Sequence, residues 1–116
     1  MNNRYTHYKG NSYVTEGIAL PLSHTLKDRI ANENVPYKEF MVYDATLSDA
    51  TLVTAKVYSF NGCYYVEREQ PYIIYYEADA DISDMYWIRE AEEFLVDTVC
   101  LDNGNFVPRF QIYNNN

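Results

Sequence analysis

Short stretches of alternating apolar and polar residues recur along this chain, as expected for β-strands that bury one face. The predicted strands cover residues 12–20, 37–46, 52–60, 63–69, 72–78 and 86–88. A last pair, 95–101 and 106–113, is expected to form a hairpin across the polar residues between them. Gly17 inside the first strand predicts a β-bulge. The pattern therefore predicts a mainly β protein, α+β at most.

One segment has the apolar spacing of a helix instead. Its apolar residues recur every four positions and so share one stripe: Leu22, Leu26 and Ile30. The helix is expected at about residues 24–33, with Thr25 and Asp28 acting as a capping box. Asn34 and Pro36 are residue types that end helices. One short helix is therefore expected beside the strands.

Asn61-Gly62 is the strongest turn signal, because both positions of a type I′ turn need positive φ. A two-residue turn there joins 52–60 to 63–69 as a β-hairpin. The implied register creates three stabilising cross-strand pairs: Tyr58 with Tyr65, Val57 with Val66 and Lys56 with Glu67. A slip of one residue would lose all three, so the register is expected to be well defined.

The length and composition predict a single domain spanning residues 1–116, and tyrosine is unusually frequent. The chain has 13 Tyr and 5 Phe, and 47% of its residues are hydrophobic, enough for a core in one domain of this length. Tyrosine gives recognition surfaces a large contact area at low entropic cost. The hairpin residues Tyr58, Tyr64 and Tyr65 are therefore candidates for binding a protein partner.

The formal net charge of −8 argues against direct nucleic-acid binding and against attraction to a membrane surface. The first residues do not resemble a signal peptide, and the apolar run 72–76 is too short to span a bilayer. A cytoplasmic location is therefore expected. Cys63 and Cys100 are expected to be buried, reduced thiols.

No metal site or cofactor is predicted. The metal-ligating side chains His7, His24, Cys63 and Cys100 are scattered along the chain. Four other residues occupy positions one, three, five and twelve of a calcium-loop pattern: Asp79, Asp81, Ser83 and Glu90. Asp84 takes the sixth position, which normally needs glycine, so an ordinary solvated turn is the preferred interpretation.

No nucleophile motif and no glycine-rich phosphate loop is present either. His7 could take part in acid–base chemistry with a nearby carboxylate, but a structural histidine is the preferred interpretation. No catalytic residue is therefore assigned from the sequence.

Three groups of residues, in a fixed order, resemble a known family. They are Tyr5, His7, Tyr8, Lys9, Gly10 and Tyr13; then Ile73, Ile74, Tyr75, Trp87, Ile88, Arg89 and Phe94; and finally Val107, Pro108, Arg109 and Phe110. The chain is similar in these motifs to the domain of unknown function 1653 family of small bacterial and phage proteins. Glu90 stands where that family has proline.

The resemblance implies a small bent sheet or SH3-like barrel built from the two ends of the chain. Residues 21–70, with the helix and the hairpin, would then be an insertion that decorates it. The resemblance also singles out five positions as a tentative ligand site: His7, Lys9, Trp87, Arg89 and Arg109. Arginine forks and a tryptophan face suit an anion or carboxylate.

A structural role for the same residues stays open. The two arginines would then pair with Glu90, Glu92 or Asp97, and the tryptophan would belong to the core. We accordingly expect a non-enzymatic binding module, such as a phage accessory or anti-defence protein that sequesters a host protein or a small ligand such as a nucleotide. The alternative is a small enzyme or nucleotide-processing factor that uses His7, Arg89 and Arg109. A homodimer is compatible with the sequence.

Overall fold

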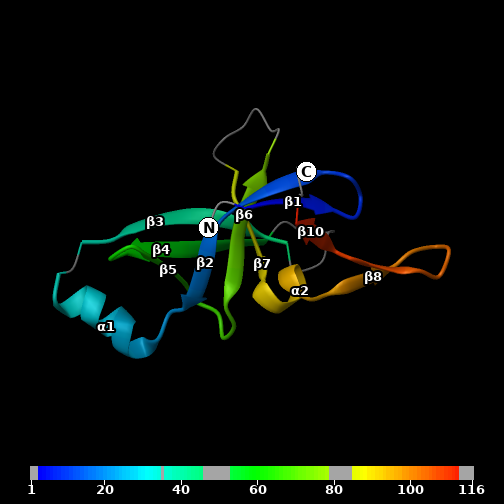
Figure 1. The fold of residues 1–116 in the computed structure, drawn as a ribbon. Helices are drawn as coiled ribbons and strands as arrows, with labels where there is room; N and C mark the ends of the chain where they lie inside the picture. The colour runs from blue at the N-terminus through cyan, green and yellow to red at the C-terminus, as the bar shows by residue number, and fades with distance from the viewer. Residues whose placement is uncertain (1–2, 35, 46–52, 79–84, 113–116) are drawn as a thin grey trace.

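A computed structural model describes residues 3–34, 36–45, 53–78 and 85–112, and these form ten strands and two helices (Figure 1). The elements in chain order are β1 (Arg4–His7), β2 (Ser12–Pro21), α1 (His24–Asn32), β3 (Lys38–Asp44), β4 (Val53–Phe60), β5 (Cys63–Val66), β6 (Tyr72–Glu77), β7 (Trp87–Glu90), α2 (Ala91–Leu95), β8 (Thr98–Cys100), β9 (Phe106–Pro108) and β10 (Phe110–Ile112). The mainly β class is confirmed.

Six strands close into a barrel in the order β2-β5-β4-β3-β7-β6, and β6 pairs back with β2. The β2–β5 and β3–β7 pairs are parallel, whereas the other pairs of the wall are antiparallel. Closure leaves no open edge along the wall, since every strand has a partner on both sides. The barrel form is confirmed, whereas the likeness to an SH3-like barrel in particular stays a prediction.

Strand β2 is long enough to take part in three pairings. It pairs with β1 near its start, with β6 along most of its length and with β5 at its end. The pairing with β6 shifts register between Thr15 and Gly17, which confirms the predicted bulge. A Cβ atom on Gly17 would lie 3.1 Å from the ring of Tyr64, so glycine lets that ring lie close to the bulge.

The Asn61-Gly62 hairpin is confirmed. Both residues have positive φ, 53° and 80°, and Tyr58 faces Tyr65 as predicted. Val57 also faces Val66, but the third predicted pair is wrong because β5 ends at Val66. Lys56 instead lies 3.7 Å from Glu39, and Glu67 lies 3.0 Å from Lys27 of α1.

Helix α1 forms where its stripe predicted, but its cap is different. Ser23 precedes the first helical residue, and its hydroxyl accepts a hydrogen bond of 3.1 Å from the Leu26 N–H. Thr25 already lies inside the first turn, so the predicted capping box is wrong. Asn34 has a φ of 52°, the left-handed conformation that commonly follows a helix.

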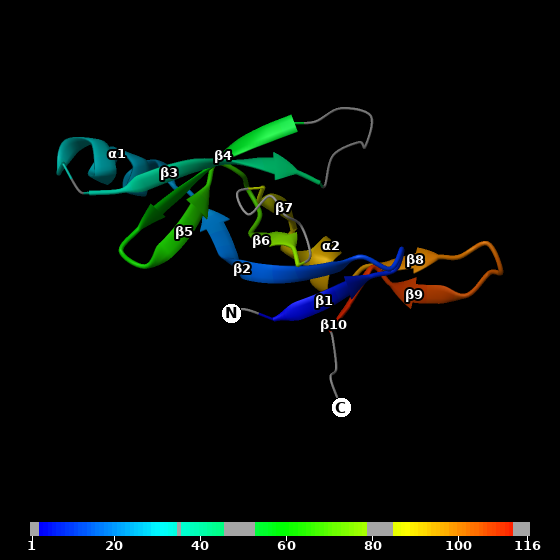
Figure 2. The same cartoon turned by 90° about the horizontal axis from the view of Figure 1, so that it is seen from above.

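The middle of the chain is part of the barrel wall. We expected it to decorate a sheet made by the two ends, and that is wrong, because β3, β4 and β5 supply three of the six barrel strands. Figure 2 shows these strands on one side of the molecule and β1 with β10 on the other. Whether residues 21–70 are an insertion relative to shorter family members stays a prediction.

Two apolar clusters lie on opposite faces of β6 because successive strand residues alternate. Tyr72 and Ile74 point into the barrel. The second cluster lies outside the wall and consists of Ile73, Tyr75, Phe94 and Phe110. Helix α2 and β10 therefore cover the outer face of β6 as a second layer.

The two ends of the chain meet in this second layer. His7 lies opposite Phe110 in the antiparallel β1–β10 pair, and the Tyr8 N–H donates to the Arg109 carbonyl at 3.0 Å. The expectation that the N- and C-terminal segments fold against each other is confirmed. The β8–β9 hairpin projects at the end of the molecule opposite α1 (Figure 1), and the molecule measures 55 × 26 × 26 Å.

Some predictions concern other parts of the chain. The acidic turn at 79–84, which contains most of the calcium-loop pattern, lies outside the described residues, as do the turn at 47–49 and the C-terminal tail.

Cys63 and Cys100 are free but exposed, so the expectation of buried thiols is wrong. Neither described helix has the length and apolar character needed to cross a membrane.

Ile74→Ala should lower the free energy of unfolding by about 2–5 kcal/mol, because Ile74 is fully buried in the barrel and its loss leaves a cavity. Ile112→Ala is the matched control, because the Ile112 residue is 57% exposed and its loss should cost about 0.5 kcal/mol or less. Urea denaturation followed by circular dichroism measures both. Equal losses would contradict the packing described here.

Candidate functional site

A cavity of about 480 Å³ lies on the outer face of the barrel wall, in the second layer. All five residues of the tentative ligand site line it: His7, Lys9, Trp87, Arg89 and Arg109. They come from the start, the middle and the end of the chain. Pairing of β1 with β10 and of β6 with β7 therefore brings together residues that the sequence separates.

Local structure explains how each residue reaches the cavity. His7 ends β1, and Lys9 lies in the turn before β2, where Gly10 has a φ of 104°. Trp87 and Arg89 alternate with Ile88 along β7, and because Ile88 is buried in the barrel the other two face outward. Arg109 sits between β9 and β10, where its N–H donates to the Asp97 carbonyl at 3.1 Å.

Arg89 is held firmly from three sides. Its side chain is 12% exposed and forms a close ion pair with Glu93, four residues further along. It also hydrogen-bonds Tyr75, and its guanidinium carbon lies 5.7 Å from the centre of the Phe110 ring. Burial disfavours its charge, but Tyr75 and Glu93 outweigh burial and raise the pKa of Arg89. Burial raises the pKa of Tyr75 to about 12, against the opposing effect of Arg89.

Arg109 is held more loosely. Its Nε lies 3.7 Å from Glu93 Oε1, and its Nη2 lies 3.7 Å from Asp97 Oδ2. Both distances exceed those of a hydrogen bond. The Arg109 Nε is buried and has no hydrogen-bond partner in the described part of the chain. Such a donor is costly to leave unsatisfied, and the Arg89 Nε is in the same condition.

His7 is a neutral hydrogen-bond donor at neutral pH. Burial, followed by the charges of Arg89, Arg109 and Lys9, lowers its pKa from 6.5 to about 4. Its Nδ1 accepts the Lys9 backbone N–H at 3.2 Å. In a neutral imidazole the proton must then lie on Nε2.

Aromatic rings form another part of the cavity lining. The half-buried Trp87 packs against Tyr43, with ring centroids 5.3 Å apart. Tyr13, Tyr75 and Phe110 make edge-on contacts with one another at 5.4 to 5.8 Å. These edge-on contacts hold the three rings tightly together on one side of the cavity.

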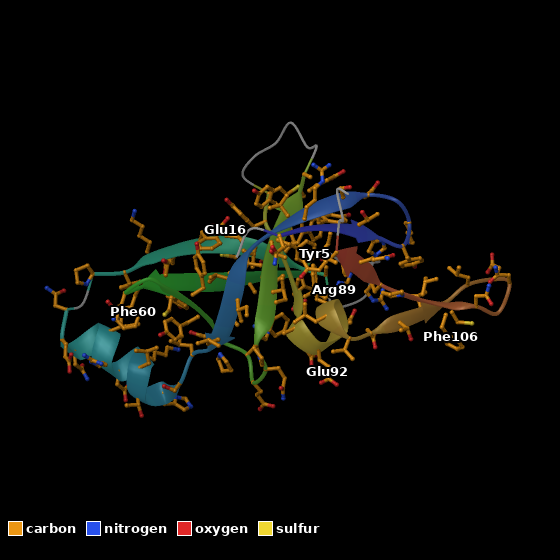
Figure 3. All side chains as sticks on the ribbon, viewed as in Figure 1. Tyr5, Glu16, Phe60, Arg89, Glu92 and Phe106 are labelled. Carbon is orange, nitrogen blue, oxygen red and sulfur yellow. The ribbon has the colours of Figure 1, made fainter. Side chains whose placement is uncertain are left out.

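The charge of the lining differs from that of the chain. Three basic residues and two acidic ones, Glu77 and Glu93, line the cavity, whereas the whole chain has a net charge of −8. Figure 3 shows Arg89 where β7, α2 and β10 come together. The cavity therefore concentrates positive charge within an acidic protein.

The predicted ion pairs are found in part. Arg109 is near Asp97, as expected, but the acid shared by both arginines is Glu93, which was not among the predicted partners. No helical spacing could have indicated this pair, because Arg89 lies on β7 and α2 begins only at Ala91. The lining residues Tyr8, Tyr13, Tyr75, Glu77 and Phe110 also went unassigned.

The predicted partner-binding tyrosines lie elsewhere and do not share one face. Tyr58 and Tyr65 pair across β4 and β5, whereas Tyr64 packs against the barrel core. The Tyr64 hydroxyl donates to Glu16 Oε1 at 3.1 Å. None of the three lines the cavity. Partner binding through Tyr58 and Tyr65 stays a prediction.

Within residues 3–34, 36–45, 53–78 and 85–112, no three His, Cys, Asp or Glu side chains gather as a metal site would require. Comparison with protein-family models finds no match, and no curated protein or solved structure is significantly similar to the chain. The resemblance to the domain of unknown function 1653 family therefore stays a prediction. The candidate site stands on its geometry alone.

The His7 imidazole should titrate at a pH near 4, as measured by NMR of its Cε1–H. The unfolded chain binds this proton near pH 6.5, before the folded protein does. The free energy of unfolding should therefore fall by about 1–3 kcal/mol as the pH falls from 6.5 to 4. His7→Gln should remove that part of the loss, and His24→Gln, in α1, should not. A His7 titration above pH 6 would contradict the assignment.

Glu93→Gln should lower the free energy of unfolding by about 2 kcal/mol, because it leaves the largely buried Arg89 guanidinium without its close carboxylate. Glu92→Gln is the control, because Glu92 is exposed one position away on α2. Thermal and urea unfolding measure both variants. If Glu92→Gln lowered the free energy of unfolding as much as Glu93→Gln, the role of Glu93 as the carboxylate partner of Arg89 would be contradicted.

Proposed function

We propose that this protein is a non-enzymatic binding module that holds a small anionic ligand in the second-layer cavity. One observation carries the proposal: His7, Lys9, Trp87, Arg89 and Arg109 converge on a single cavity from three separate parts of the chain. Hydrogen-bond donors, positive charge and aromatic side chains there match what an anion attached to a ring requires.

The size of the cavity supports a small ligand. Its volume of about 480 Å³ falls in the usual range of small-molecule sites, roughly 300–1,000 Å³. A concave site also suits a small molecule better than the flat surface of a folded partner. Binding of a protein through Tyr58 and Tyr65 would use a different surface, because neither residue lines the cavity.

The ionisation of the site favours binding over catalysis. A general base works best with a pKa near the working pH, whereas the pKa of His7 is about 4. Arg89 is engaged by Glu93 and Tyr75, so its charge is already partly used within the protein. The alternative, a small enzyme that uses His7, Arg89 and Arg109, would have to take its base from elsewhere.

Sequestration is the biological role that we attach to this binding. A protein that holds an anion without transforming it acts by lowering the free concentration of that anion. An accessory phage or anti-defence protein acting on a host nucleotide would work in this way. This role follows from the proposed binding and from the resemblance of the motifs.

A panel of small anions, comprising sulfate, citrate, benzoate, phenyl phosphate and adenosine monophosphate, tests the proposal by thermal shift. At least one should raise the melting temperature of the wild type by roughly 5 °C at saturation. Arg109→Gln should abolish the increase, because it removes the loosely held guanidinium.

Lys56→Gln is the matched control, because it removes a positive charge on β4 outside the cavity. It should leave the ligand-induced increase unchanged. NMR of the ligand after long incubation should show it unaltered. No shift with any anion, or an equal shift in Arg109→Gln, would overturn the binding proposal, and conversion of the ligand would establish the enzyme instead.

A further inference from the structure

The basic groups of the cavity differ in how far the protein already uses them. Arg89 is bound to Glu93 and Tyr75 and packs on Phe110. Arg109 reaches the carboxylates of Glu93 and Asp97 only at 3.7 Å. Both arginines have a buried Nε without a hydrogen-bond partner in the described part of the chain, but only Arg89 has a close carboxylate contact, so Arg109 is the arginine whose terminal donors are less engaged.

Two further donors lie beside Arg109. The Lys9 side chain is 5.8 Å from the centre of the Tyr8 ring and forms no ion pair within the described residues. His7 donates through Nε2, since its Nδ1 accepts from the Lys9 backbone. The charges of Lys9 and Arg109 are both close enough to His7 to disfavour its protonation. The three donors therefore line the same cavity.

We propose that the anionic group of the ligand is a phosphate monoester on a small molecule, held jointly by His7, Lys9 and Arg109. This inference rests on the proposed function and adds the chemical class of the ligand. Three donor groups on three residues match the three terminal oxygens of a monoester, each of which accepts strong hydrogen bonds.

The charge of the ligand determines whether a phosphate monoester or a carboxylate binds better in this site. Glu93 already lies between the two arginines, so an incoming anion competes with a carboxylate that is part of the protein. A monocarboxylate offers one charge and two oxygens, no more than Glu93 itself. A phosphate monoester carries about −1.5 to −2 at neutral pH and has a third oxygen for Lys9. The dianion is therefore the better competitor for Arg109.

Trp87 offers a place for a planar ring, because it lines the same cavity from β7 and faces away from the barrel interior. A ring attached to the phosphate could therefore stack on Trp87 within one site.

Binding of a dianion should change the protonation of His7. The charged and titratable groups that line the cavity with the imidazole are Tyr8 and Lys9 in the turn after β1, Tyr13 on β2, Tyr75 and Glu77 on β6, Arg89 on β7, Glu93 on α2 and Arg109 before β10. Burial and the charges of Arg89, Arg109 and Lys9 lower the pKa of His7, and a bound phosphate anion would offset the effect of the charges. The ligand should therefore raise this pKa above 4.

A matched set of phenyl compounds tests the inference: phenyl phosphate as the monoester, methyl phenyl phosphate as the diester and benzoate as the carboxylate. NMR titration of the folded wild-type protein measures each dissociation constant. Phenyl phosphate should bind at least about tenfold more tightly than the other two, because it alone supplies both the second charge and the third terminal oxygen. Saturating phenyl phosphate should raise the His7 titration above pH 4.

Lys9→Gln and Arg109→Gln should each weaken phenyl phosphate at least about tenfold, and the control Lys56→Gln should not. A backbone amide spectrum like that of the wild type verifies the fold of each variant. Loss of binding in a folded Lys56→Gln protein would show that overall charge, not the cavity, governs affinity and would overturn the inference.

The outcomes separate this inference from the proposed function. Benzoate or the diester binding as tightly as phenyl phosphate, still dependent on Arg109, would overturn the monoester and leave the anion-binding function standing. An unchanged His7 titration at saturation would overturn the role of His7. A phosphotyrosine peptide that binds more tightly than phenyl phosphate would overturn the small-molecule source. No binding of any anion in either panel would overturn both proposals.

Discussion

Pairing of β2 with β6 is the interaction on which the rest of the structure depends. It closes the barrel, because β6 is also joined to β7 and through it to the remaining wall. The same pairing places β1, which is bonded to the start of β2, over the outer face of β6. The bulge between Thr15 and Gly17 lets one strand take part in both layers. Without this pairing there would be neither a closed core nor a second layer.

The cavity follows from that second layer. A barrel of six strands fills its own interior with side chains, so a site for a ligand has to be built outside the wall. Here β1, α2 and β10 stand away from β6 and β7 far enough to leave a cavity, while Phe94 and Phe110 anchor them to the wall. The rings of these two phenylalanines stack with centroids 4.0 Å apart, which fixes how closely α2 approaches β10.

Electrostatics gives this site its character. Gathering Lys9, Arg89 and Arg109 around a partly buried imidazole is unfavourable unless an anion compensates them. Glu93 forms a close ion pair with Arg89 but lies 3.7 Å from Arg109. Positive charge at Arg109 is therefore only partly compensated in the folded protein. That imbalance within an acidic chain is the physical basis of the anion binding that we propose. Burial, together with these cations, lowers the pKa of His7, so His7 stays neutral and serves as a donor.

The sequence by itself determined the local structure. Tyr58 opposite Tyr65, the Asn61-Gly62 turn, the bulge at Gly17 and the stripe of α1 all depend on residues close in the chain, whose preferences act without distant partners. The five motif positions also indicated the site, although not its geometry. The tertiary structure alone decided that the middle segment forms half of the barrel and that Glu93 joins the two arginines, because parallel pairings and buried charge partners depend on long-range closure that no local pattern encodes.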